Sequence, residues 1–298
     1  MEYMKKIFFL FIIIHFFFSL TLAHFPEREK IYNSNDYGFS QYRTLSLNNS
    51  KTVVLTFDDG PRIGTTDRVL DLLYQYRVKA TFFILTQKVT DKTMYLIERM
   101  FGEGHIVASH SHSMKHRNSN NISKNIFHDD FFRSIMVIEK LDNIFNASNQ
   151  VEIYYRFPYG AYGRAEKYHH LNVLKKNSYE IFNDNCINYV FWDIDSQDWF
   201  RKLTSFQIAQ NILSSINGGI YYKPQFVIKS NKKKRTVVEE YMEYPVGGGI
   251  ILLHDIYEKS VEALSVFLGQ IETEDIRVVP LSEVQEYSYY GRKCKVQR

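Results

Sequence analysis

Residues 52–61 read TVVLTFDDGP and join a strand to a charged turn. Residues 52–57 are apolar or β-branched without polar alternation, which is typical of a strand buried on both faces of a sheet. Two adjacent acids, Asp58 and Asp59, follow, and Gly60-Pro61 then forces a turn that can bring both acids into one pocket. The stretch therefore predicts a strand of a parallel sheet with a charged pocket at its carboxyl end.

Six further runs of this kind follow along the chain. They are short and nearly continuous, and they lie at 80–85, 106–109, 153–157, 189–194, 250–253 and 276–279. Helical patterns separate them at 65–76, 91–101, 123–145, 163–178, 204–216 and 258–271. Seven strands that alternate with helices predict an α/β fold with a parallel sheet, open or closed into a barrel. Functional residues then gather at the carboxyl ends of the strands.

The composition excludes several classes of protein. Of the 298 residues, 45% are hydrophobic and 23% charged, which predicts a globular chain and excludes disorder of the whole. A formal net charge of +4 is too small to argue for nucleic-acid binding. The only cysteines, Cys186 and Cys294, form no CxxC pair, which excludes a thiolate zinc finger. A disulfide between them and unpaired buried thiols both stay open.

The N-terminus has the order of regions of a secretory signal peptide. Lys5 and Lys6 precede an apolar run at 7–22, and small residues lead to Ala23, after which we expect cleavage. The signal predicts a secreted or cell-surface protein; an uncleaved membrane anchor is the alternative, and no later segment is predicted to span a membrane. The predicted order is signal peptide, extended arm, folded domain and C-terminal tail, at 1–23, 24–50, 51–286 and 287–298.

One stretch, 217–246, interrupts the alternation of strands and helices. It carries the basic run 232–235, which reads KKKR, followed by Glu239, Glu240 and Glu243. We interpret it as a solvated insertion loop, and the alternative is a patch that binds nucleic acid or an anionic glycan.

The first candidate site combines carboxylates and imidazoles. Adjacent acids such as Asp58 and Asp59 in one pocket repel each other, which is costly without a cation; the alternative is two turn residues in solvent. His112 and His116, at the i, i+4 spacing, place two imidazoles on one face of a helical turn. Two histidines and one aspartate make a three-ligand site with an open position, as in catalytic zinc centres. Four other histidines, which have no such partner, are predicted to be structural: His105, His110, His169 and His170.

Three more clusters fall at later strand ends. Residues 156–160 read RFPYG and offer a guanidinium and a turn whose N–H can meet an oxyanion. Residues 195–199 read DSQDW, with acids beside an aromatic ring, and 252–255 read LLHD, with one more histidine. Each cluster alone fits a structural role, but their shared position at strand ends predicts one site.

In this order, TFDDGP, HSMKH, RFPYG, DSQDW and LLHD resemble the five motifs of the polysaccharide deacetylases, the NodB-like carbohydrate esterases of family 4. The resemblance covers about residues 51–284, nearly all of the predicted mature chain. It implies a distorted (β/α) barrel of about seven parallel strands.

The resemblance also implies roles for single residues. Asp58 would be the general base and His254 the general acid, while Asp59, His112 and His116 would bind a divalent metal. The metal implied is Zn²⁺, with Co²⁺ or Mn²⁺ as alternatives.

Five further residues receive roles by the same resemblance. Arg156 would pair with Asp58, and Asp198 would hydrogen-bond the general acid. Tyr159 would supply the oxyanion N–H, and Trp199 and Leu252 would wall the acetyl pocket.

The predicted function is metal-dependent removal of N-acetyl groups from an N-acetylglucosamine polysaccharide, chitin or peptidoglycan. Such a polymer is the expected partner, nucleic acid is not, and we expect a monomer. Two alternatives stay open: an O-acetyl esterase acting on xylan through the same site, and a catalytically silent glycan-binding protein on the same scaffold.

Overall fold

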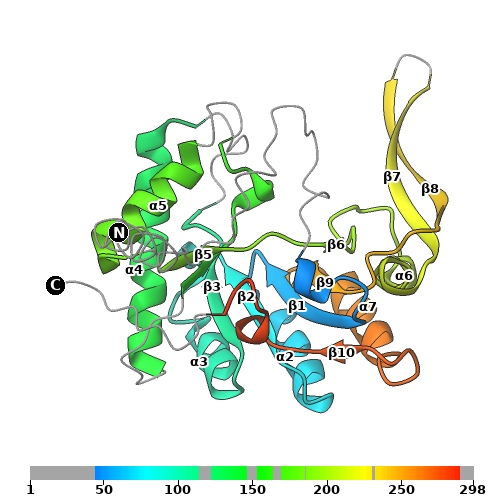
Figure 1. Ribbon diagram of the computed structural model, residues 1–298, viewed down its shortest axis with the longest axis horizontal. Helices are drawn as coiled ribbons and strands as arrows, with labels where there is room; N and C mark the ends of the chain where they lie inside the picture. Colours follow the sequence, from blue (N-terminus) through cyan, green and yellow to red (C-terminus); the bar gives the residue numbers. More distant parts are fainter. Residues whose placement is uncertain are drawn as a thin grey trace, which may run out of the picture.

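The computed structural model describes residues 44–113, 122–145, 153–163, 169–184, 186–229 and 232–288 (Figure 1). The predicted signal peptide, most of the predicted arm, His116 and Cys294 lie outside these ranges. In the described part, no helix is both long and apolar enough to cross a bilayer.

A parallel sheet forms the centre of the fold. Its strands follow the order β5-β4-β3-β2-β1-β9-β6, and β10 pairs with the beginning of β1. The strands are β1 (Thr52–Asp58), β2 (Ala80–Ile84), β3 (Ile106–Ser109), β4 (Ile153–Tyr155), β5 (Ile187–Tyr189), β6 (Ile194–Asp195), β9 (Gly249–His254) and β10 (Arg277–Val278). The sheet curls into a half-barrel, so the predicted α/β class with a distorted (β/α) barrel is confirmed.

The apolar character of β1 follows from its place in the sheet. It pairs with β2 on one side and β9 on the other, and all seven of its residues are buried. Alternate side chains enter two different cores, Val54 on one face and Val53, Leu55 and Phe57 on the other. A strand buried on both faces has no position for a solvated side chain, which explains the unbroken apolar run.

Helices cover both faces of the sheet. One core contains residues of α4 and α5, and the other contains residues of α2, α3, α6 and α7 together with Ile138 and Leu141 of α4. The helices are α2 (Thr66–Gln75), α3 (Met94–Gly102), α4 (Lys124–Phe145), α5 (His169–Phe182), α6 (Ser205–Asn217) and α7 (Glu258–Leu268), with short 3₁₀ turns η3 (Leu45–Leu47), η4 (Thr86–Lys88), η6 (Pro158–Gly160) and η8 (Leu281–Glu283). Each of the six predicted helical segments overlaps one of these helices. Thr204 begins α6 with a capping box completed by Gln207.

One predicted strand, 189–194, is wrong. The chain leaves β5 at Tyr189, crosses the open side of the half-barrel, and enters β6 at Ile194 (Figure 1). Because β5 and β6 are the two end strands of the sheet, the crossing closes the curl between them. The apolar pattern persists along the crossing because Val190 and Phe191 are buried in the core without belonging to a strand.

The insertion is a hairpin and not an irregular loop. β7 (Gly219–Lys229) and β8 (Lys232–Met242) pair antiparallel through eleven residue pairs. The ladder forms because β-branched and aromatic residues dominate its inner half. In Figure 1 the hairpin stands out beside β6 and α6, at the opposite end of the molecule from α4 and α5.

Both boundaries of the folded domain extend beyond the predicted ones. Leu47 packs into the core, and the backbone N–H of Thr44 donates to Asp193 Oδ1 at 2.5 Å, so the end of the predicted arm belongs to the domain. Tyr287, placed in the predicted tail, is fully buried. Cys186 is buried next to β5 and is disulfide-bonded.

Candidate active site

The pairing of β1 with β9 places the predicted base and acid side by side. Asp58, the last residue of β1, is in register with His254, the last residue of β9. Partners in a parallel register project from the same face of the sheet. The carboxylate and the imidazole therefore meet at the carboxyl edge, where the sequence predicts the site.

Arg156 holds the Asp58 carboxylate from the interior of the half-barrel. Its Nη1 donates to Asp58 Oδ1 at 2.8 Å and to Thr56 Oγ1 at 2.7 Å. Nε and Nη2 donate to the carbonyls of Val190 and Phe191 on the crossing segment, at 3.1 and 3.0 Å. The guanidinium is fully buried, so its contacts replace the water that a charged group loses on burial. The predicted pair is thus present, and it also ties β1 to the segment that closes the barrel.

His254 is held from behind by Asp198. Its Nδ1 lies 2.7 Å from Asp198 Oδ1, and its backbone N–H donates to Asp198 Oδ2 at 2.7 Å. Ser260 Oγ also donates to Oδ2, at 2.6 Å. Burial alone lowers the pKa of the imidazole, but the Asp198 carboxylate outweighs burial and raises the pKa to about 10. His254 is therefore cationic at neutral pH and can donate a proton through its other ring nitrogen.

Asp59 has a buried oxygen that no group in the described part of the chain satisfies. Its Oδ1 is without a hydrogen-bond partner among the described residues, and His110 Nε2 lies 3.6 Å from it. The same nitrogen lies 3.6 Å from Asp58 Oδ2, while His110 Nδ1 is fixed 2.9 Å from the Arg156 carbonyl. A buried carboxylate oxygen that faces an imidazole at more than hydrogen-bond distance fits a bound cation.

His110, for which the sequence predicts a structural role, faces both acids at the site. His112, the predicted ligand, lies in the next loop with its Nδ1 3.0 Å from Thr86 Oγ1. Among the described residues, no three His, Cys, Asp or Glu side chains form an ion-binding group. His116, the third predicted ligand, is outside those ranges.

Asp130 of α4 supports the loop after β3, and sequence reasoning missed it. It accepts backbone N–H groups of His112 and Ser113 at 2.9 and 3.3 Å. It also accepts the hydroxyls of Ser111 and Ser113. The sequence feature that could have indicated Asp130 is an acid in the helix after the histidine-rich loop. Many exposed acids in helices share that feature, so it does not single out Asp130.

Left-handed backbone recurs at the carboxyl edge. Four residues other than glycine have positive φ directly after strands of the sheet or in the following turn: Asp59 (73°), Ser111 (79°), Tyr159 (57°) and Gln197 (63°). Residues with a Cβ rarely adopt such angles, which concentrate at functional sites. Tyr159 lies in η6, after β4, where the resemblance implies an oxyanion N–H.

Of the two residues predicted to line the acetyl pocket, Trp199 is exposed and Leu252 is buried. Trp199 is 41% exposed, and its Nε1 lies 3.3 Å from Asp195 Oδ1. Burial raises the pKa of Asp195 to about 6. Leu252 is buried in β9, in register with Thr56, two residues before the histidine.

Asp255 fixes the turn that follows the two acids. It is fully buried, accepts a hydrogen bond from Thr66 Oγ1, and occupies the space that a Cβ at Gly60 would need. Burial raises the pKa of Asp255 to about 7. The glycine of the TFDDGP motif is therefore required by close approach.

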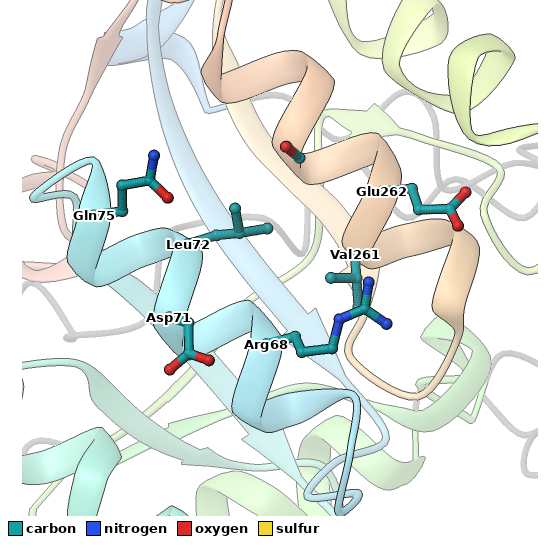
Figure 2. A pocket seen from close by; sticks show the side chains of 7 residues that line it. Arg68, Asp71, Leu72, Gln75, Val261 and Glu262 are labelled. Carbon is teal, nitrogen blue, oxygen red and sulfur yellow. The ribbon is translucent and has the colours of Figure 1, made fainter.

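A surface depression of about 410 Å³ lies between α2 and α7 (Figure 2). Mixed charges line it, with Arg68 and Asp71 on α2 and Glu262 on α7. It shares no residue with the site at the carboxyl edge.

Fold and site together define a hydrolase of the (β/α)-barrel class. A profile described as polysaccharide deacetylase matches residues 47–181. The chitooligosaccharide deacetylase of Bradyrhizobium sp. (strain ANU 289) is 30% identical over 252 residues, which cover 80% of this chain and 92% of that protein. The chain belongs to the polysaccharide deacetylase family.

Two further comparisons agree. The peptidoglycan-N-acetylmuramic acid deacetylase PdaC of Bacillus subtilis is 27% identical over 80% of this chain, which spans only 39% of that protein's length. A family 4 acetyl xylan esterase from Clostridium thermocellum, solved with a cobalt ion, superposes with a TM-score of 0.53 at 24% identity over 78% of this chain and 89% of that one. This structure supports the fold.

Proposed function

We propose that this protein removes N-acetyl groups from a polysaccharide that contains N-acetylglucosamine, releasing acetate and leaving free amino sugars. The observation that carries the proposal is the register of Asp58 with His254, each held by its own buried partner, Arg156 and Asp198. A base and a cationic acid on neighbouring strands suit an amide, because the leaving amine is poor until it is protonated.

Different residues of the chain would carry out different steps of the reaction. Asp58 takes the proton from the attacking water while Arg156 orients its carboxylate. The backbone N–H of Tyr159 donates a hydrogen bond to the acetyl oxygen as negative charge develops on it. His254 then protonates the amine, and Trp199 and Leu252 enclose the acetyl methyl group.

A divalent metal fits the donors at the edge. Asp59 and His110 would hold it, with the predicted ligands His112 and His116 completing the set, and this mixture of carboxylate and imidazole suits Zn²⁺, Co²⁺ or Mn²⁺. Such an ion polarises the acetyl carbonyl and acidifies the attacking water. Export through the predicted signal peptide would bring the site to cell-wall or extracellular polymers.

Acetate release tests the proposal. Purified protein supplied with Zn²⁺ is incubated with chitooligosaccharides, peptidoglycan and acetylxylan, with Asp58→Asn as the inactive control. We expect acetate from an N-acetylated polymer and none from the control. Release from acetylxylan alone would make the protein an O-acetyl esterase, and binding without release would make it a silent glycan-binding protein.

A further inference from the structure

The β7–β8 hairpin separates its charges along its length. Its outer half, residues 225–236, contains five cations and no acid: Lys229, Lys232, Lys233, Lys234 and Arg235. The acids Glu239 and Glu240 lie in the inner half, where Glu240 pairs with Lys223 at 3.1 Å. Exposed like charges this close together on one strand, as at Lys234 and Arg235, repel each other, and a bound polyanion relieves that repulsion.

The base of the hairpin is part of the rim of the candidate site. Tyr221 Oη donates to the carbonyl of Asp195 at 3.1 Å, next to the loop that carries Asp198 and Trp199. Tyr222 is tied to α6 from both backbone groups, because its N–H donates to Asn211 Oδ1 at 2.6 Å and its carbonyl accepts from Asn211 Nδ2 at 3.0 Å. The direction of the hairpin is therefore set by the same segment that positions the acid and the aromatic wall.

Cations continue from the rim onto the hairpin. Arg201 and Lys202, both exposed, lie two and three residues after Trp199, and Lys202 Nζ donates to the carbonyl of Arg235 in β8. Lys259 Nζ lies on the same rim and donates to the Phe200 carbonyl at 2.7 Å. Lys234 and Arg235 are themselves exposed. A basic surface thus runs from the aromatic wall toward the tip of the hairpin.

We propose that the exposed hairpin cations Lys234 and Arg235, together with Arg201 and Lys202, bind carboxylate groups carried by the same polysaccharide whose acetamido group enters the site. The inference rests on the proposed function, and it selects an acidic N-acetylated polymer over a neutral one. An eleven-residue strand extends roughly 36 Å, so the cations meet sugars several units away from the reacting one. Binding at that distance favours long acidic chains and changes substrate affinity without changing the chemical step.

The test uses two soluble polymers with the same backbone, neutral glycol chitin and anionic carboxymethyl chitin. The hairpin variant is K232S/K233S/K234S/R235S. The matched control variant removes four exposed cations elsewhere, K92S/K124S/R133S/K140S. Binding is measured by affinity electrophoresis and turnover by acetate release, both from low to high NaCl. Anionic phosphatidylglycerol vesicles and duplex DNA serve as competing ligands.

We expect the hairpin variant to bind carboxymethyl chitin about five- to thirty-fold more weakly at low salt, since several exposed ion pairs with the polymer's carboxylates are lost together. Its KM should rise by the same factor with kcat unchanged, and the salt dependence expected of the wild type should become weaker. Glycol chitin and the control variant should show no change. Equal effects on both polymers, no effect on either, or tighter binding of the vesicles or DNA than of carboxymethyl chitin would overturn the inference.

Failure of the proposed function gives a different result. If the wild type releases acetate from no N-acetylated polymer, the deacetylase assignment falls, and the electrophoresis still decides whether the hairpin binds an acidic chain.

Discussion

The carboxyl edge of the sheet and the β7–β8 hairpin carry charge in opposite ways. At the edge, Asp58 and Asp198 are buried, and each is held by partners from other elements. On the hairpin, Lys234 and Arg235 are exposed on a two-stranded ladder. Charges that must act at one atom need a rigid, dry setting, whereas charges that recognise a polymer act from solvent at low individual strength. The difference predicts large effects from the edge and small ones from the hairpin.

The largest effect is expected from Asp58→Asn. The substitution removes the base and leaves the buried Arg156 with a weaker partner. Acetate release should fall by about 10²–10⁴, because removal of a general base commonly costs that much. Steady-state kinetics on chitooligosaccharides measure the loss, and Lys234→Ser on the hairpin is the comparison. A variant within a few-fold of the wild type would show that Asp58 is not the base.

Metal binding distinguishes two histidines at the edge. His110→Ala should weaken Zn²⁺ binding by at least about ten-fold, because His110 faces the unsatisfied oxygen of Asp59. His112→Ala should weaken it less, since this ring contacts Thr86. Calorimetric titration of metal-free protein measures both. A larger loss of Zn²⁺ affinity in His112→Ala than in His110→Ala would show that His112 is the ligand, as the sequence predicts.

The Asp198–His254 pair should set the alkaline limit of activity. A general acid must be protonated, so kcat/KM falls as pH rises through the pKa of His254, near 10. In Asp198→Asn the strongest raising interaction is lost, while burial still lowers the pKa of His254, so the alkaline limit should move to lower pH. Rates on N-acetyl substrates, measured from about pH 5 to about pH 11, give the shift.

Two observations check the origin of that shift. Activated esters need little protonation of the leaving group, so Asp198→Asn should slow them less than amides. Because the folded-state pKa is raised above 6.5, the stabilisation from the pair is fully present below pH 6.5 and is lost as pH rises through about 10. The wild type should therefore exceed the variant in thermal stability most at acidic pH. An unchanged alkaline limit would show that His254 is not the acid.

The smallest effect is expected at the base of the hairpin. Tyr221→Phe removes one hydrogen bond to the carbonyl of Asp195 and should lower the free energy of unfolding by about 0.5–1.5 kcal/mol. Tyr241→Phe is the matched control, because Tyr241 is largely exposed in β8. Urea denaturation followed by fluorescence measures both. Equal losses in the two variants would contradict a specific anchor at Tyr221.

Sequence patterns predicted the parts of the fold that obey simple periodicity. Strands such as β1 and β9 could be predicted because burial on both faces requires continuous apolar residues. The crossing at 190–193 could not, because a segment that closes a barrel over the core is as apolar as a strand. The hairpin was missed because Lys232–Arg235 suggests a solvated loop, whereas pairing with β7 is a long-range property.

The candidate site shows the same division. The pairs Arg156 with Asp58 and Asp198 with His254 could be predicted because each member belongs to a motif at a strand end. His110 was missed because it and His112 alternate in one histidine-rich loop, so spacing alone does not say which one leaves the strand toward the acids. Ser111, which lies between the two histidines, has a left-handed backbone that points their side chains in different directions. A sequence does not reveal that backbone angle.

The Asp58–Arg156 pair also constrains how this lineage can change. Arg156 holds both the reactive carboxylate and the segment that closes the barrel, so selection for folding protects a residue of the proposed catalytic machinery. A mutation at Asp58 alone leaves a buried guanidinium without its counter-charge and costs about 3–5 kcal/mol, enough to remove much of a domain's stability. Descendants that lose activity but stay folded should therefore keep this pair and change first at more exposed positions of the site, such as Trp199.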